Sequence, residues 1–239
     1  MERHFVQELE KLNKRINKMG MLAAEQIHHA LTALVECNAE LAITIIERDN
    51  DVDEMDVKID KLCQRIFALT QPVATDLRLI MASLKMNNDL ERMADLAVNI
   101  ARKVEGLCDY REIITDLKID ELAGRTDVMV KDVINILTTR NSVFVRDIFE
   151  EAQSIRDKVQ EISSLIIEQM IHKREVIVVA TNLMIILTQI ERIAGYSTNI
   201  AESVVFLVEG RIVKHSKTFK VSLEGEELQK PGDENPSDV

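Results

Sequence analysis

Apolar residues recur along this chain at intervals of three and four, a spacing that places their side chains on one face of an α-helix. The first apolar face starts near the N-terminus and ends at a break, Cys37-Asn38. Its members are Phe5, Leu9, Leu12, Ile16, Met19, Ala23, Ile27, Leu31 and Leu34. The pattern predicts one long helix that packs against neighbouring helices along its whole length.

The same spacing predicts two further helices in the first half of the chain. One is expected over residues 40–69, because Pro72 shortly after it disfavours continuation of the helix. The next helix is expected to begin with an N-cap from Thr75-Asp76 and to end near Asp109. Long amphipathic helices joined by short connections pack as antiparallel bundles. The first half of the chain is therefore predicted to be a three-helix bundle.

The plan repeats after a short connection over residues 109–119. Three more helices are predicted, over about 120–137, 141–172 and 175–208. From Lys214 the chain becomes rich in Gly, Pro and acidic residues, a composition typical of disorder. We therefore expect an all-α protein with six long helices. Its predicted parts are a first three-helix bundle (1–110), a second (111–213) and a disordered acidic tail (214–239).

An internal repeat supports this division. Residues 88–101 align without gaps with residues 188–201. Apolar matches between two helices prove little, but polar matches inside the seam are less expected by chance. The identical positions are Glu91 and Glu191, Arg92 and Arg192, Ala94 and Ala194, Asn99 and Asn199, Ile100 and Ile200, and Ala101 and Ala201. The two bundles are thus predicted to be duplicated units related by a pseudo-two-fold axis.

Composition narrows the function classes. Only 3% of the residues are aromatic, and the chain contains only 7 Gly and 3 Pro. It therefore lacks the frequent turn-forming residues that are typical of β-sheet proteins. A net charge of −11 disfavours nucleic-acid binding, which needs a basic surface. The most apolar stretch, 176–190, is short of the ~20 residues that span a bilayer, and no signal-peptide core is present at the start. We expect a cytoplasmic protein that meets membranes only through partners.

Candidate chemistry lies in carboxylates on the third predicted helix. Glu91, Asp95 and Asn99 are spaced four apart, so they share one helical face. A second acidic patch on the preceding helix contains Asp49 and Asp53. Oxygen-rich clusters suit Mg, Ca, Mn or iron. An acidic stripe on a helix is usually a solvated face, and sequence alone does not fix the register of the two helices.

Other sites have weaker support. No Walker A loop, dinucleotide-binding glycine motif or nucleophile elbow occurs, and no catalytic triad is evident, so we expect a non-enzymatic protein. One Glu-x-x-His motif occurs, Glu25 to His28, whereas ferritin-like di-iron bundles need two. The three cysteines lie far apart in sequence, a pattern typical of reduced core cysteines in a cytosolic protein. They are Cys37, Cys63 and Cys108.

Several of these segments together resemble the PhoU family of phosphate-uptake regulators. The similarity covers about residues 3–215. The segments that carry it are Gln71-Pro72-Val73-Ala74-Thr75-Asp76-Leu77-Arg78, the run from Asp89 to Ala101, Glu191-Arg192-Ile193, Thr198-Asn199-Ile200-Ala201-Glu202, His4-Phe5, Glu8-Leu9 and Met19-Gly20. The combination of motifs is specific, although no single segment would be.

The resemblance implies a fold of two three-helix bundles and a regulatory role. Family members are cytoplasmic partners of a phosphate ABC transporter and of a sensor histidine kinase, damp phosphate uptake, and keep the phosphate-starvation response off. The family also has metal clusters, with iron among the metals, and the matching motif here runs from Glu91 to Asp95. PhoU-like proteins also accompany other phosphate carriers, so the transporter stays open. Exposed faces of long helices commonly self-associate, so a homodimer is expected.

The second copy departs from the family pattern. Gly195 stands where the family has an acid, Tyr196 replaces a usual His, and the acidic stretch is reduced to residues 156–160. Glu191, Asn199 and Glu202 remain as candidate ligands. We therefore expect one competent metal site in the first bundle and a weak or absent one in the second. The alternative function is storage or trafficking of iron at carboxylate clusters, which the lack of paired Glu-x-x-His motifs disfavours.

Overall fold

The computed structural model describes residues 2–212, and all regular structure within this range is helical. This confirms the predicted all-α class and its six long helices. The predicted acidic tail over 214–239 lies outside the described residues. The α-helices are α1 (Glu2–Glu36), α2 (Ala39–Glu47), α3 (Asp49–Leu69), α4 (Ala74–Val104), α5 (Arg111–Asp116), α6 (Ile119–Thr139), α7 (Val145–His172) and α8 (Ile177–Glu209), with 3-10 turns η1 (Glu105–Tyr110), η2 (Ser142–Phe144) and η3 (Arg174–Val176).

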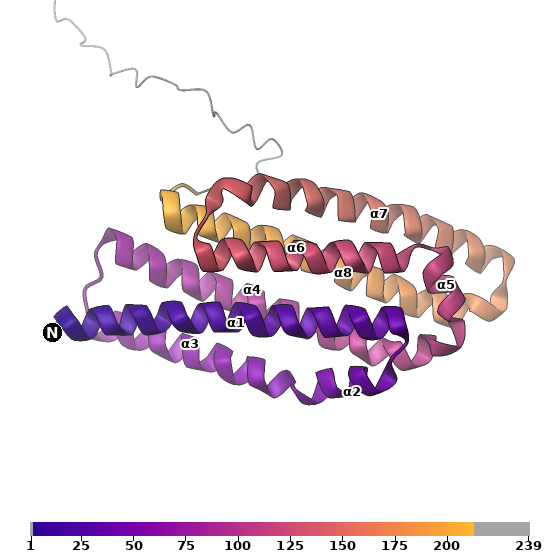
Figure 1. The fold of residues 1–239 in the computed structure, drawn as a ribbon, viewed down its shortest axis with the longest axis horizontal. Helices are drawn as coiled ribbons and strands as arrows, with labels where there is room; N and C mark the ends of the chain where they lie inside the picture. Colours follow the sequence, from indigo (N-terminus) through magenta and orange to yellow (C-terminus); the bar gives the residue numbers. More distant parts are fainter. Residues whose placement is uncertain (1, 213–239) are drawn as a thin grey trace, which may run out of the picture.

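The predicted apolar faces form the interior. In α1, for example, Leu12, Met19 and Ile27 are fully buried. Helices α1, α2, α3 and α4 pack together as the first bundle, and α6, α7 and α8 as the second. Figure 1 shows the long helices running roughly along the longest axis of the molecule, with α5 at the end opposite the N-terminus.

The two bundles share one continuous core. They meet where α1 packs on α6 and where α4 packs on α8. Helix α8, with its 3-10 start, is the one described segment long and apolar enough to span a membrane. Most of its apolar residues, however, are buried against α4, α6 and α7. The structure thus uses α8 as the core helix of the second bundle.

Helices α4 and α8 are antiparallel in a register that three pairs of residues define. From one pair to the next, the residue number increases along α4 and its continuation η1 by as much as it decreases along α8 and its C-cap, Gly210. Asp89 accepts a hydrogen bond from Asn199, a Cβ on Gly106 would lie 3.6 Å from Asn182, and a Cβ on Gly210 would lie 3.4 Å from Arg78. Ala94 and Ala194, which occupy equivalent places in the repeat, fall at the midpoint of this register and are both buried. The internal two-fold axis of the duplication therefore passes between them.

A glycine permits the close approach of α1 and α6. A Cβ on Gly20 would lie 3.1 Å from Leu137 Cδ2 and 3.2 Å from Ile134 Cδ1. These distances leave no room for a larger side chain unless buried neighbours move. Gly20 inside a long helix is explained by this contact between the bundles.

Three details of the predicted helices were wrong. The second helix is divided at Arg48, which ends α2 and precedes α3, so that Asp49 and Asp51 fall in the first turn of a new helix, where the helix dipole favours acidic residues. Helix α4 begins after Val73, which offers no side-chain cap, so Thr75-Asp76 lies inside the first turn. The connection at 109–119 is mostly helical, formed by the end of η1 and by α5.

Candidate functional site

The structure brings the acidic residues of α3 and α4 together on one side of the first bundle. We call this group the acidic cluster; its members are Asp49, Asp53, Asp56, Glu91 and Asp95. Burial raises the pKa of Asp53, and the charges of Asp49 and Asp95 raise it further. Since Asp95 is on α4, this coupling shows that the two acidic patches face each other across the helix pair.

Local sequence and packing fix the register of these helices. The helix break at Arg48 starts α3 with acidic residues in its first turn, where the helix dipole favours negative charge. Further along, the buried Asn87 of α4 donates from Nδ2 to Asp56 Oδ1 at 2.7 Å and to Asp60 Oδ1 at 3.3 Å. This amide holds α3 against α4 and sets Asp53 level with Glu91 and Asp95.

Glu91 is the most strongly perturbed member of the acidic cluster. Burial, together with the charges of Asp95, Asp56 and Asp53, raises its pKa to about 6, and the charge of Arg92 opposes this rise. The Arg92 Nε atom lies 3.8 Å from Glu91 Oε2. Crowded carboxylates of this kind are relieved either by a proton or by a bound cation. The donor set, all oxygen, fits a hard or borderline metal ion.

As the side chains stand, no three His, Cys, Asp or Glu residues among 2–212 converge around one metal position. Two of the predicted ligands have ordinary protein partners. Asp49 Oδ1 accepts a hydrogen bond from Gln26 Nε2 at 3.2 Å, and Asn99 Oδ1 accepts one from Arg102 Nη1 at 3.5 Å. Asp53, Glu91 and Asp95 are left as the centre of the acidic cluster.

The corresponding place in the second bundle has a different chemistry. Arg156 of α7 lies beside Glu191 of α8, with 3.5 Å between Arg156 Nε and Glu191 Oε1. Gly195 has no atom within 4 Å of where its Cβ would be, so no side chain fills the position of the first bundle's Asp95. A guanidinium at this position supplies the positive charge that a metal would supply elsewhere. The residues here do not fit a cation site.

The other two candidate ligands of the second bundle, Asn199 and Glu202, have different neighbours from Glu191. Asn199 and Glu202 lie at the α4–α8 interface beside Asp89. Lys85 Nζ of α4 is 4.0 Å from Glu202 Oε2. Asp89 itself is 5% exposed, and burial raises its pKa to about 6 although Lys85 and Asn199 lower it. These residues form a polar contact between the bundles.

Sequence reasoning did not single out Asn87 or Asp89. A signal was available for Asn87, since it precedes Leu90 by three positions and so falls on the predicted apolar seam. A polar residue on such a seam is buried and needs a hydrogen-bond partner. For Asp89 no such signal exists, because its burial depends on the second bundle packing against α4.

Comparisons with known proteins agree with the duplicated architecture. The sequence profile described as the PhoU domain matches twice, at residues 16–104 and 119–204. A phosphate-specific transport system accessory protein PhoU from Serratia marcescens is 30% identical over 88% of this chain and 87% of its own length. A homologue with the same description from Aquifex aeolicus is 32% identical over 87% of this chain and 94% of its own length.

Solved structures show the same fold. The crystal structure of PhoU from Pseudomonas aeruginosa superposes with a TM-score of 0.81 at 27% identity, covering 87% of this chain and 100% of that one. The phosphate transport system regulatory protein PhoU from Streptococcus pneumoniae gives 0.78 at 28% identity, over 88% and 99%. The fold therefore defines a helical protein of two repeated three-helix units. This chain belongs to the PhoU family.

Proposed function

We propose that this protein is a cytoplasmic, non-enzymatic negative regulator of phosphate uptake and of the phosphate-starvation response. In this proposal it is an adaptor between the ATPase of a phosphate ABC transporter and a sensor histidine kinase. The observation that carries the proposal is family membership over nearly the whole chain, with relatives described as accessory or regulatory proteins of phosphate transport. The proposal thus rests on the whole fold rather than on one reactive residue.

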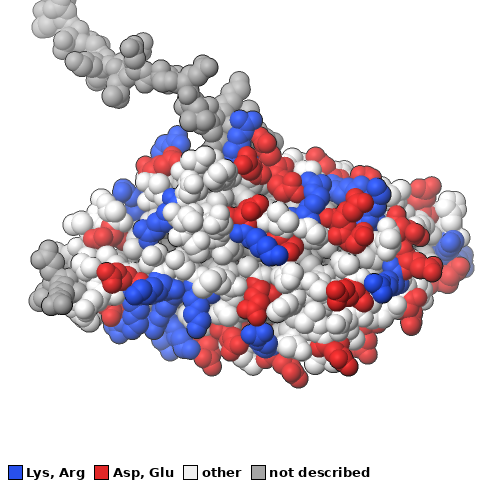
Figure 2. All heavy atoms as spheres, viewed as in Figure 1, with Lys and Arg blue, Asp and Glu red and all other residues white. Residues whose placement is uncertain are grey.

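The surface supports a docking role. A groove of about 890 Å³ lies between α6 and α7, with the exposed apolar side chains of Val128 and Phe144 and a rim of carboxylates. The carboxylates are Glu121, Asp132, Asp147 and Glu151. Figure 2 shows an uncharged area on the viewed face near the passage from α6 to α7, with charges interspersed elsewhere. We propose that this groove receives an apolar, basic-flanked segment of the transporter ATPase.

A genetic experiment tests the regulatory role. The gene would be deleted from its native cells, and phosphate uptake and a starvation-induced promoter would be followed at high phosphate. The proposal expects uptake to rise and the promoter to be on without starvation, with both effects reversed by the wild-type gene. Unchanged uptake and a silent promoter in the deletion strain would contradict it.

We further propose that the acidic cluster holds a divalent or trivalent metal ion, with iron among the expected metals. Asp53, Glu91 and Asp95 would be its ligands, and the bound ion would cancel their mutual repulsion and tie α3 to α4. Storage or trafficking of iron is the second candidate function, and the acidic cluster is the observation that favours it. If storage is the function, bound iron should far exceed one ion per chain and should not affect the starvation promoter.

A further inference from the structure

Two of the three cysteines lie against each other although they are 71 residues apart in sequence. Cys37 forms the turn between α1 and α2, and Cys108 lies in η1. The Cys108 Sγ atom lies 3.3 Å from the Cys37 carbonyl oxygen and 3.3 Å from the Val104 carbonyl oxygen, which share its one S–H donor. The side chains of Cys37 and Cys108 are also within hydrogen-bonding reach of each other. The fold therefore places two thiols side by side at the end of the first bundle.

The backbone at Cys37 is unusual for a residue with a side chain. Its φ is 54°, in the left-handed region that normally selects Gly or Asn at the end of a helix. Asn38 directly after it caps α2, with the Leu41 amide 3.0 Å from Asn38 Oδ1. The short α1–α2 turn thus holds Cys37 in one conformation, next to Cys108.

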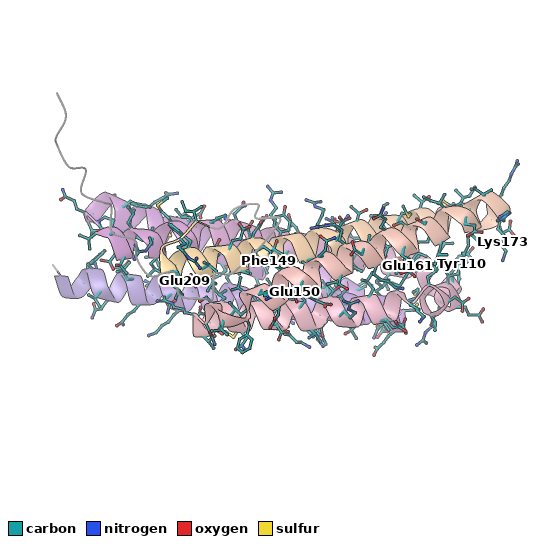
Figure 3. All side chains as sticks on the ribbon, turned by 90° about the horizontal axis from the view of Figure 1, so that it is seen from above. Tyr110, Phe149, Glu150, Glu161, Lys173 and Glu209 are labelled. Carbon is teal, nitrogen blue, oxygen red and sulfur yellow. The ribbon has the colours of Figure 1, made fainter. Side chains whose placement is uncertain are left out.

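Solvent and small oxidants can reach this pair. Both cysteines are partly exposed, and Cys108 lines an open hollow of about 870 Å³ together with residues 109–113, 115 and 116. Figure 3 shows Tyr110, which lines the same hollow, near one end of the molecule, and Glu209 toward the other. Cys63 is the opposite case, because it is fully buried in the core and burial raises its pKa to about 12.

We propose that Cys37 and Cys108 form a dithiol site that a peroxide converts into an intramolecular disulfide. One thiolate attacks a peroxide oxygen, the O–O bond breaks, and a sulfenic acid and water form. The second thiol attacks the sulfenic sulfur, an S–S bond forms, and a second water leaves. The two sulfurs together lose two electrons and two protons, and hydrogen peroxide is reduced to two molecules of water. Thioredoxin-type dithiols would reverse the step by exchange.

Nearby groups set the pH dependence of this reaction. Burial raises the pKa of Cys37, the charge and hydrogen bond of Cys108 raise it further, and Arg111 lowers it. At neutral pH the Cys37 thiol is therefore mostly protonated, and only the thiolate is the nucleophile. The bond would join the α1–α2 turn to η1, which begins the connection between the bundles. Oxidation would therefore fix the α1–α2 turn to η1, at the end of the first bundle from which the chain continues into the second bundle.

Peroxide treatment of the full-length protein tests the proposal. The protein would be exposed to hydrogen peroxide, free thiols would be alkylated, and mass spectrometry would identify the modified and linked peptides. We expect a peptide pair joined through Cys37 and Cys108, with Cys63 alkylated only after unfolding. The linked pair should disappear on reduction and should form faster as the pH rises above neutral.

Variants separate a dithiol site from general oxidation. Cys63→Ser should form the same disulfide at the same rate, whereas Cys37→Ser should instead leave Cys108 as a sulfenic acid that a dimedone probe traps. In the wild-type protein, Cys37 and Cys108 fully alkylated after peroxide treatment would overturn the proposal. So would links between different protein molecules in place of the internal one.

Discussion

Asp89 of α4 accepts a hydrogen bond from Asn199 of α8, and this buried contact joins the two bundles near the middle of their interface. The Oδ2 atom of Asp89 has no hydrogen-bond partner within the described part of the chain. A buried carboxylate with an unpaired oxygen favours the protonated form. The interface between the two repeats therefore contains a titratable group, which gives it a defined pH dependence.

Replacement of Asp89 by Asn should change how stability varies with pH. Burial raises the folded-state pKa of Asp89 to about 6 from an ordinary value of 3.8. Its stabilising contribution is thus complete below about pH 4 and is lost as the pH rises through about 6. Relative to the wild type, Asp89→Asn should gain roughly 2 kcal/mol in unfolding free energy between pH 4 and pH 7.5.

Urea unfolding at several pH values measures this difference. Glu91 titrates in the same range, but its contribution is common to both proteins and cancels in the comparison. A difference between wild type and Asp89→Asn that stays constant from pH 4 to pH 7.5 would show that folding does not raise the pKa of Asp89.

The close contact of α1 and α6 predicts opposite effects of one substitution at two glycines. Gly20→Leu should destabilise the protein by about 2 kcal/mol or more, because Leu137 and Ile134 leave no space for the added atoms. Gly124→Leu on α6 should be neutral or stabilising by up to ~1 kcal/mol, since nothing lies within 4 Å of its Cβ position and Leu is the better helix former. Thermal unfolding of the two variants provides the measurement, and equal destabilisation would contradict the contact.

The two bundles should differ in metal binding. We expect Glu91→Ala to remove most of the metal that the protein holds, because Glu91 is central to the acidic cluster. Glu191→Ala should leave the metal content nearly unchanged, because Glu191 faces Arg156. Glu54→Ala is a suitable control on α3, since Glu54 is exposed and pairs with Lys58. Elemental analysis after purification measures the metal content of all three variants. Equal losses of metal from Glu91→Ala and Glu191→Ala would contradict the prediction.

Most of the fold follows from sequence, because the apolar spacing identifies both the helices and their buried faces. Leu12, Met19 and Ile27 were predicted on the seam of α1, and the structure buries all three. Duplication was visible in the matched Glu-Arg and Asn positions, and the PhoU profile matches twice accordingly. Helix ends were less predictable, since the break at Arg48 depends on a balance of weak local preferences.

The site was harder to predict, because it depends on contacts between helices. Periodicity placed Glu91 and Asp53 on their helices, but only the packing of Asn87 against Asp56 fixes which carboxylates face each other. The same limit applied to Asn199, whose helical face gives no sign that another bundle covers it. The proximity of Cys37 to Cys108 is likewise a property of the fold, which no spacing rule reveals.

Direct binding to the transporter ATPase is the decisive test of the proposed adaptor role. The purified wild-type protein and the variants Val128→Arg and Ile43→Arg would be titrated against the purified ATPase subunit at low and high salt. Val128 and Ile43 are equally exposed, at 58% and 57%, but only Val128 lines the α6–α7 groove. We expect wild-type binding that weakens with salt, a loss of tenfold or more in affinity for Val128→Arg, and little change for Ile43→Arg. No binding of the wild-type protein, or equal losses from both variants, would contradict this role.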